Sequence, residues 1–195
     1  MERRLFLASA ASAALLFVMP ERAAAQLDGD WAAFEGLGGL FERLRQITDP
    51  IADNISRTKF LWFLNRLQEP LWDILQEKGN VQRALRIADC AGDRRSVIAL
   101  ADQSARKIVP LADELSNRMR VLASAIKPAD TRQEAAQLAD RLGALQNRKM
   151  WTNRVGQFCG DNAAGRQRFL AEVEASIAVV KEARLRLENL MEKIS

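Results

Sequence analysis

The feature that most constrains the fold is a regular apolar seam in the second half of the chain. Its members follow one another in alternating steps of three and four residues, which is the spacing of a helix that keeps one stripe against a partner helix. Pro110 falls at an outward position and leaves the stripe intact. The pattern predicts one long helix from residue 98 to residue 126. The seam consists of Ile98, Ala101, Ala105, Ile108, Ala112, Leu115, Met119, Leu122 and Ile126.

A second long helix is predicted from its starting signal. Thr131 and Glu134 have the spacing of a capping box, in which the hydroxyl and the carboxylate accept hydrogen bonds from free backbone N–H groups at the helix start. An apolar stripe follows, breaks register at Lys149 and Thr152, and resumes on a shifted line toward Phe158. We expect a single helix over this whole stretch.

A third long helix follows Asn162, with apolar residues at heptad spacing as far as Ile194. Arg184 is the one polar residue on this seam. Because the connections between these helices are only a few residues long, consecutive helices must run antiparallel. We therefore predict an all-α fold, in which residues 93–195 form an elongated, coiled-coil-like antiparallel bundle of three long helices, up-down-up.

Residues 26–92 are less regular and are predicted to form an N-terminal helical layer packed on the bundle. Asp30 can cap the start of a first helix with its carboxylate. Further helix starts are expected after Pro50 and near Pro70, because proline suits the first turn of a helix. Gly79 is expected to end the helix that begins near Pro70, and a short helix follows it.

The first 25 residues have the order of a secretory signal peptide. The pair Arg3-Arg4 precedes an apolar, alanine-rich run, and small residues follow from Ala23 to Ala25. A membrane-spanning helix needs about 20 apolar residues, and Pro20 with two charges interrupts this run before that length. We expect cleavage after Ala25, with an uncleaved membrane anchor as the alternative.

This arginine pair, followed after one residue by Phe6 and Leu7, resembles the twin-arginine export signal. The segment departs from that pattern at Glu2, where Ser or Thr is usual, and at Ala8, where Lys is frequent. An ordinary Sec signal that contains two arginines is the alternative. Either interpretation implies that the mature protein is exported and is periplasmic or extracellular.

The two cysteines are predicted to form a disulfide. Cys90 precedes the helix predicted over residues 98–126, and Cys159 ends the next helix, which runs back antiparallel to it. Both should therefore lie at the same end of the bundle, and in an oxidising compartment they should pair. Closing so long a loop stabilises the fold by about 4 kcal/mol in the chain-entropy model. Two buried free thiols are the alternative, and the lack of Cys-x-x-Cys spacing argues against a redox pair.

The absence of histidine removes several classes of active site. Ser-His and Cys-His nucleophiles, His-ligated zinc or haem, and the di-iron pattern of helical bundles all require it. Carboxylates such as Glu172 and Glu174 lie two residues apart and so do not share a helix face. We therefore expect a protein that is not an enzyme, with no catalytic residue, cofactor or metal site. A net charge of +4 is too small to indicate nucleic-acid binding.

An aromatic and basic segment is the one local feature that rises above this background. It includes Phe60, Trp62, Phe63, Arg66 and Trp72. These side chains could pack over the bundle as core aromatics. They could instead lie at a membrane surface or grip an acyl chain, or form an exposed patch that docks a protein.

Two functional classes are compatible with these features. The first is an exported, non-catalytic adaptor or scaffold of the bacterial cell envelope that works through protein–protein contacts. The second is a lipid- or small-molecule-binding bundle with an aromatic pocket near Trp62 and Trp72. A binder needs a concave apolar cavity, whereas an adaptor needs an exposed apolar strip. The sequence leaves the oligomeric state and the identity of any partner open.

Overall fold

The computed structural model describes residues 30–90, 94–147 and 150–195, and the predicted signal peptide lies outside these ranges. Every regular element in the described ranges is helical, which confirms the prediction of an all-α fold. The one β-bridge within these ranges pairs Ile51 with Ile126. The helices are α2 (Asp30–Gln46), α3 (Arg57–Ile87), α4 (Arg94–Ser124), α5 (Ala129–Gly143), α6 (Met150–Gln157) and α7 (Ala163–Ile194), with 3₁₀ turns η1 (Ala144–Asn147) and η2 (Phe158–Gly160).

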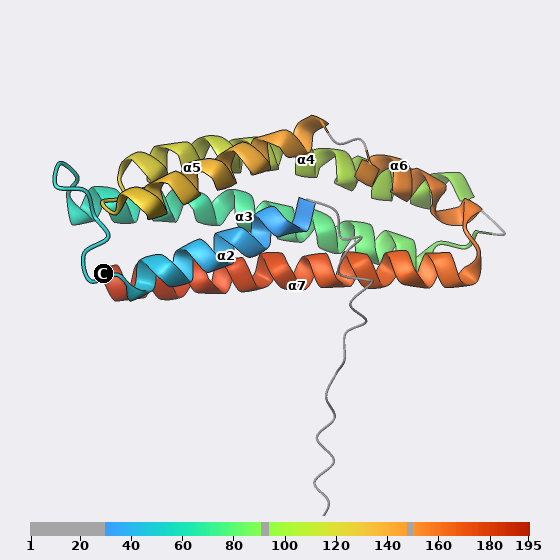
Figure 1. Cartoon of the computed structure of the whole chain (residues 1–195). Coiled ribbons are helices and arrows are strands. Elements are labelled where there is room, and N and C mark those ends of the chain that lie inside the picture. Colours follow the sequence, from blue (N-terminus) through green and yellow to red (C-terminus); the bar gives the residue numbers. More distant parts are fainter. Residues whose placement is uncertain (1–29, 91–93, 148–149) are drawn as a thin grey trace, which may run out of the picture.

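The helices form an elongated bundle whose two ends differ (Figure 1). The helices α3, α4 and α7 run along most of its length, with α3 packed against both α4 and α7. At the end that contains the C-terminus, α2 packs on α7 and α5, and α5 packs on α4. At the other end, α6 packs on α4. We call the end with α2 and α5 the α2 half, and the end with α6 the disulfide half.

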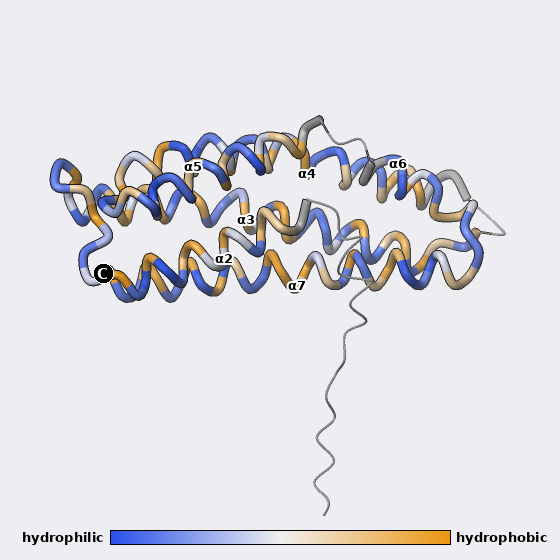
Figure 2. The backbone as a smooth tube through the Cα atoms, in the orientation of Figure 1, coloured by the Kyte–Doolittle hydropathy of each residue, from blue (hydrophilic) through white to orange (hydrophobic). Residues whose placement is uncertain are grey.

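The predicted apolar seam becomes the inner face of α4. From Ala101 to Ile126 all of its members are buried, and Ile98 is partly exposed. Pro110 lies inside the helix on the exposed side, as its heptad position predicts. The alternation of apolar and polar residues along the helices is visible in Figure 2.

The helix α3 corrects the predicted layout of the N-terminal region. It is one continuous helix through Pro70 and Gly79, where separate helices were expected to begin and end. Its start is set by Ser56, whose hydroxyl accepts a hydrogen bond from the backbone N–H of Lys59 at 3.2 Å, and not by Pro50. Packing against α4 and α7 stabilises a helix that local propensity alone would interrupt.

The expected up-down-up bundle of three long rods is not confirmed, because the second rod is divided. The stretch predicted as one helix contains α5, the turn η1 and α6. The predicted capping box is also wrong: the N-cap of α5 is Pro128, without a side-chain hydrogen bond, and Thr131 is buried within the helix. Packing of Thr131 in the interior takes precedence over the local capping signal.

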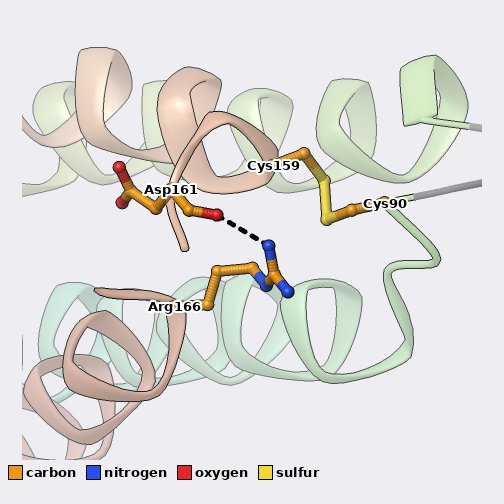
Figure 3. Close-up of a disulfide and its surroundings, with 4 residues drawn as sticks. All are labelled: Cys90, Cys159, Asp161 and Arg166. Atoms are coloured by element: carbon orange, nitrogen blue, oxygen red, sulfur yellow. Dashed lines mark hydrogen bonds between the residues drawn. A yellow bond between two sulfur atoms is a disulfide. The ribbon is translucent and has the colours of Figure 1, made fainter. Parts of the chain in front are cut away.

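The predicted disulfide between Cys90 and Cys159 is present (Figure 3). It joins the segment after α3 to the turn η2, with 5.2 Å between the two Cα atoms. Beside it, the guanidinium of Arg166 donates to the backbone carbonyl of Asp161 at 2.7 Å and holds the turn that leads into α7. The disulfide therefore links the connection between α3 and α4 to the turn that follows α6.

Candidate functional site

The aromatic and basic segment divides between the core and the surface of the α2 half. Phe60 is fully buried and Phe63 is 8% exposed, so both belong to the core. Trp62 and Trp72, in contrast, are 52% and 45% exposed, and Arg66 is exposed between them. The outer face of α3 thus presents two tryptophans to the solvent.

Trp62 is held in place by its neighbours on α3. The guanidinium carbon of Arg66 lies 5.0 Å from the centre of the indole, which is a cation–π distance. The Phe63 ring meets the indole edge-on, with 5.3 Å between ring centres. No carboxylate in the described part of the chain forms an ion pair with Arg66, whose N–H groups therefore remain able to bind an acceptor from outside.

Trp72 is held by a residue from another helix. The guanidinium carbon of Arg184, on α7, lies 4.4 Å from the centre of the Trp72 indole. The same guanidinium pairs with Glu188 at 2.8 Å. Arg184 was not among the predicted site residues, although its position as the one polar residue on an apolar seam was the signal that could have identified it.

An open groove lies beside Trp72, between α3 and Arg184 of α7, and a second groove lies on α7. The first has a volume of about 520 Å³ and the second about 340 Å³, with Arg184 lining both. Leu185, which is 51% exposed, lines the second groove. We call the resulting surface the Trp strip; it comprises Trp62, Arg66, Glu69, Trp72, Arg184 and Leu185.

The Trp strip is braced from behind by Arg118 of α4, whose side chain is only 13% exposed. Both terminal nitrogens of Arg118 donate to one carboxylate oxygen of Glu69 at 3.2 Å, and the guanidinium also pairs with Glu114. A further N–H donates to the backbone carbonyl of Arg66. That carbonyl lacks its usual helical partner because Pro70, four residues later, has no N–H. Arg118 therefore compensates for the proline and fixes the backbone beneath the strip.

A buried polar cluster lies between the two halves. The ammonium of Lys78, a fully buried residue, lies 3.4 Å from the hydroxyl of Ser176 and 5.7 Å from the ring centre of Phe34. Ser176 is itself buried, and its hydroxyl donates to the backbone carbonyl of Val173 at 2.7 Å. A serine and a lysine can form a nucleophile and its base, but a substrate cannot reach these two groups. No pattern in the sequence indicated this cluster.

Glu77 lies next to that cluster and faces α4. Burial raises the pKa of Glu77, but hydrogen bonds from Asn80, Ser104 and Lys107 outweigh this effect, so the pKa lies below its ordinary value of 4.5. The Lys107 ammonium is 3.0 Å from the Glu77 carboxylate. Glu77 is therefore an ionised link between α3 and α4.

The other predicted sites are a signal peptide and, by expectation, no metal site. The signal residues Arg3, Arg4, Phe6, Leu7, Ala23 and Ala25 lie outside the described residues. Within the described ranges, no group of three or more Cys, Asp or Glu side chains is arranged to hold a metal ion. None of the described helices combines the length and the apolar character needed to cross a membrane.

Comparison with known proteins gives no relative from which a site could be transferred. No family model, no curated protein and no solved structure matches the chain.

Proposed function

We propose that this protein is an exported, non-catalytic adaptor or scaffold of the bacterial cell envelope that binds another protein through the Trp strip. The observation that carries the proposal is the exposure of Trp62 and Trp72 on the outer side of α3, above a core of buried apolar residues. Exposed apolar surface with a polar rim is typical of protein-binding sites. Tryptophan and arginine are also the residues most enriched among those that dominate binding energy.

The form of the surface supports an adaptor over a binder of lipids or small molecules. A small-molecule site is usually an enclosed, mainly apolar cavity with a few polar groups. The groove beside Trp72 is open, and Arg66, Glu69 and Arg184 bring charged groups of both signs to it. Such a groove suits the side chains of a protein surface better than an acyl chain.

The rigidity of the strip also favours binding of a protein. Each tryptophan is packed against an arginine, and Arg118 fixes the backbone and Glu69 from behind. Side chains that are already ordered lose less conformational entropy when a partner binds.

In-cell photo-crosslinking tests the proposal. A photoreactive residue replaces Trp62, Arg66 or Trp72 in turn, and exposed Gln137 on α5 is the matched control. After cell fractionation, we expect a specific protein adduct in the envelope fraction from the three strip positions and none from the control. Adducts to lipid alone would favour the lipid-binding alternative, and equal adducts from Gln137 would exclude the strip as the contact.

A further inference from the structure

We propose that the protein that covers the Trp strip is a second copy of this chain. Its α3 would lie antiparallel to α3 of the first copy, across a two-fold axis on the outer side of the helix at the level of Leu67, whose own side chain is buried in the core. This inference rests on the proposed function and names the partner of the same surface. The reason is that the outer face of α3 is complementary to itself in shape and in charge.

The tryptophans have the spacing that such an axis requires. In an antiparallel pair of helices related by a two-fold axis, residues at equal distances before and after the axis lie level with each other, and those on the facing side can make contact across the interface. Trp62 and Trp72 lie five residues before and five residues after Leu67. At 1.5 Å per residue, each is about 7.5 Å from the axis. Trp62 of each copy therefore lies level with Trp72 of the second copy, and both pairs of exposed indoles become buried.

The charges at the centre of the face are complementary in the same arrangement. Arg66 lies one residue before Leu67 and Glu69 lies two residues after it, so Arg66 of each copy is within about 1.5 Å, along the helix axis, of Glu69 of the second copy. The Glu69 side chain is 74% exposed, and only one of its carboxylate oxygens is engaged by Arg118. The other oxygen can accept a hydrogen bond from Arg66. Two equivalent ion pairs then form at the axis.

The face is large enough for a stable dimer. The exposed side of α3 runs from Thr58 to Gln76, a length of about 27 Å. Packed helices lie about 8–10 Å apart, so α3 with the adjoining edges of α4 and α7 is about 25–30 Å wide. The product is on the order of 700–800 Å², close to the roughly 800 Å² that each partner buries in a standard interface.

A second copy fits this face better than a partner with one sign of charge. Arg66 and Arg184 would attract an acidic peptide or an anionic membrane, but Glu69 and Glu188 lie beside them and would repel it. A charged face that meets its own copy across a two-fold axis needs both signs of charge to be complementary, and the Trp strip has both.

The test is a charge-swap experiment on the exported protein, purified from the periplasm or the medium. The mass of the particle in solution is measured by light scattering, and the composition of mixed dimers by native mass spectrometry. Wild-type protein is expected to be a dimer. Arg66→Glu places like charges at both central contacts, as does Glu69→Arg, so each variant alone should bind itself roughly 100-fold or more weakly.

The result specific to this arrangement is that mixing the two charge-reversed proteins restores a dimer. A mixture of Arg66→Glu and Glu69→Arg proteins forms heterodimers, because each like-charge contact becomes an opposite-charge contact. The chain with both substitutions forms homodimers again. Loss of helical structure in either variant, measured by circular dichroism, would explain a monomer but would not explain restoration on mixing.

A second pair of variants avoids Glu69 and therefore leaves its contact with Arg118 intact. Trp62→Glu and Trp72→Lys proteins each weaken their own dimer and recover it when mixed, because the new charges meet at one contact and both original tryptophans meet at the other. The dimer in this mixture is expected to contain one chain of each variant.

Three outcomes would overturn the inference. The first is a wild-type monomer at about 100 μM, since interfaces of this size bind in the micromolar range or tighter. The second is a dimer that neither charge reversal weakens, and the third is a weakened dimer that neither mixture restores. If a strip position then crosslinks to a different protein in cells, the adaptor function stands without the self-association. If it crosslinks only to lipid, both proposals fail.

Discussion

The α2 half and the disulfide half share α3, α4 and α7, but they close the bundle by different means. In the α2 half, α2 and α5 complete a closed ring around a core that contains Phe34, Phe41 and Phe60. In the disulfide half, α6 takes their place, and the described core is a smaller cluster that includes Phe158 and Phe169 as well as Ala84 and Ala101. A covalent bond between Cys90 and Cys159 is added at this end.

The two halves obtain their stability in different ways. A small core provides little hydrophobic stabilisation, and small domains commonly add disulfides for this reason. The Trp strip lies on the half that has the larger described core, where packing and the Arg118 brace hold it without a crosslink. The disulfide therefore supports the half that does not present the candidate binding surface.

The largest test of this comparison is removal of the disulfide. Replacing Cys90 and Cys159 together by Ala should lower the free energy of unfolding by about 4 kcal/mol in the chain-entropy model, since the bond closes a 69-residue separation. Denaturant unfolding measures the loss. Replacing both cysteines also prevents a remaining thiol from pairing between chains.

The location of the effect matters as much as its size. Hydrogen exchange at backbone amides should become faster in α6 and in the adjoining ends of α4 and α7, with α2 and the Trp strip least affected. An equal acceleration in α2 would contradict the division into two halves.

The second test removes the brace behind the Trp strip. Arg118→Met leaves the carbonyl of Arg66 without a donor and Glu69 and Glu114 without their shared cation, and should cost about 1–3 kcal/mol in stability. Arg120→Met is the matched control: this exposed arginine of α4 pairs with Asp140 at the surface, and its loss should cost less than about 1 kcal/mol.

A double-mutant cycle distinguishes the hydrogen bond from Arg118 to the Arg66 carbonyl from the general effect of removing the charge of Arg118. Pro70→Ala restores an N–H that can bind the Arg66 carbonyl within the helix. In that background Arg118→Met should cost about 1 kcal/mol less than in the wild-type chain, since the carbonyl is no longer left unpaired. Equal costs in the two backgrounds would show that Arg118 does not compensate for the proline.

The same contact explains why the sequence predicted α4 well and α3 poorly. The α4 seam could be read from its own residues, because burial of one stripe is a local periodic property. The continuity of α3 depends on a donor from Arg118, which is 52 residues from the carbonyl it satisfies. Local signals at Pro70 and Gly79 contain no information about that contact, so they predicted breaks that tertiary packing removes.

The candidate site was predictable in part for a similar reason. The sequence identified Trp62, Arg66 and Trp72 because they gather in one segment, but it left open whether they are exposed. Their exposure depends on which face of α3 meets α4 and α7, which is settled only by packing. Arg184 stands out in the sequence as a polar residue on an apolar seam, but it and Arg118 reach the strip from other helices, so their local patterns do not show where they lie.

The last prediction concerns the loss of stability at acid pH and compares two carboxylates. Glu77 is largely buried between the two halves, whereas Glu174 is exposed in the disulfide half. Glu77 has a pKa below 4.5, mainly because hydrogen bonds from Asn80, Ser104 and Lys107 outweigh the effect of burial. The pKa of Glu174 is also lowered, by its hydrogen bond from Arg86. For both groups, the stability that ionisation contributes is fully present above the unfolded-state pKa and is lost as the pH falls through the lower folded-state pKa.

High salt should weaken the contribution of Glu174 to stability more than that of Glu77. The Glu77 side chain is 15% exposed and that of Glu174 is 46% exposed, so the ion pair of Glu174 is screened more strongly. Thermal unfolding between about pH 3 and 6 should show that Glu77→Gln flattens the acid-induced loss of stability by less than about 1 kcal/mol. This flattening should persist in about 1 M salt, where the corresponding effect of Glu174→Gln should disappear. If salt abolishes both effects equally, Glu77 behaves as a surface group, and the contact between α3 and α4 at the junction is more open to water than its burial indicates.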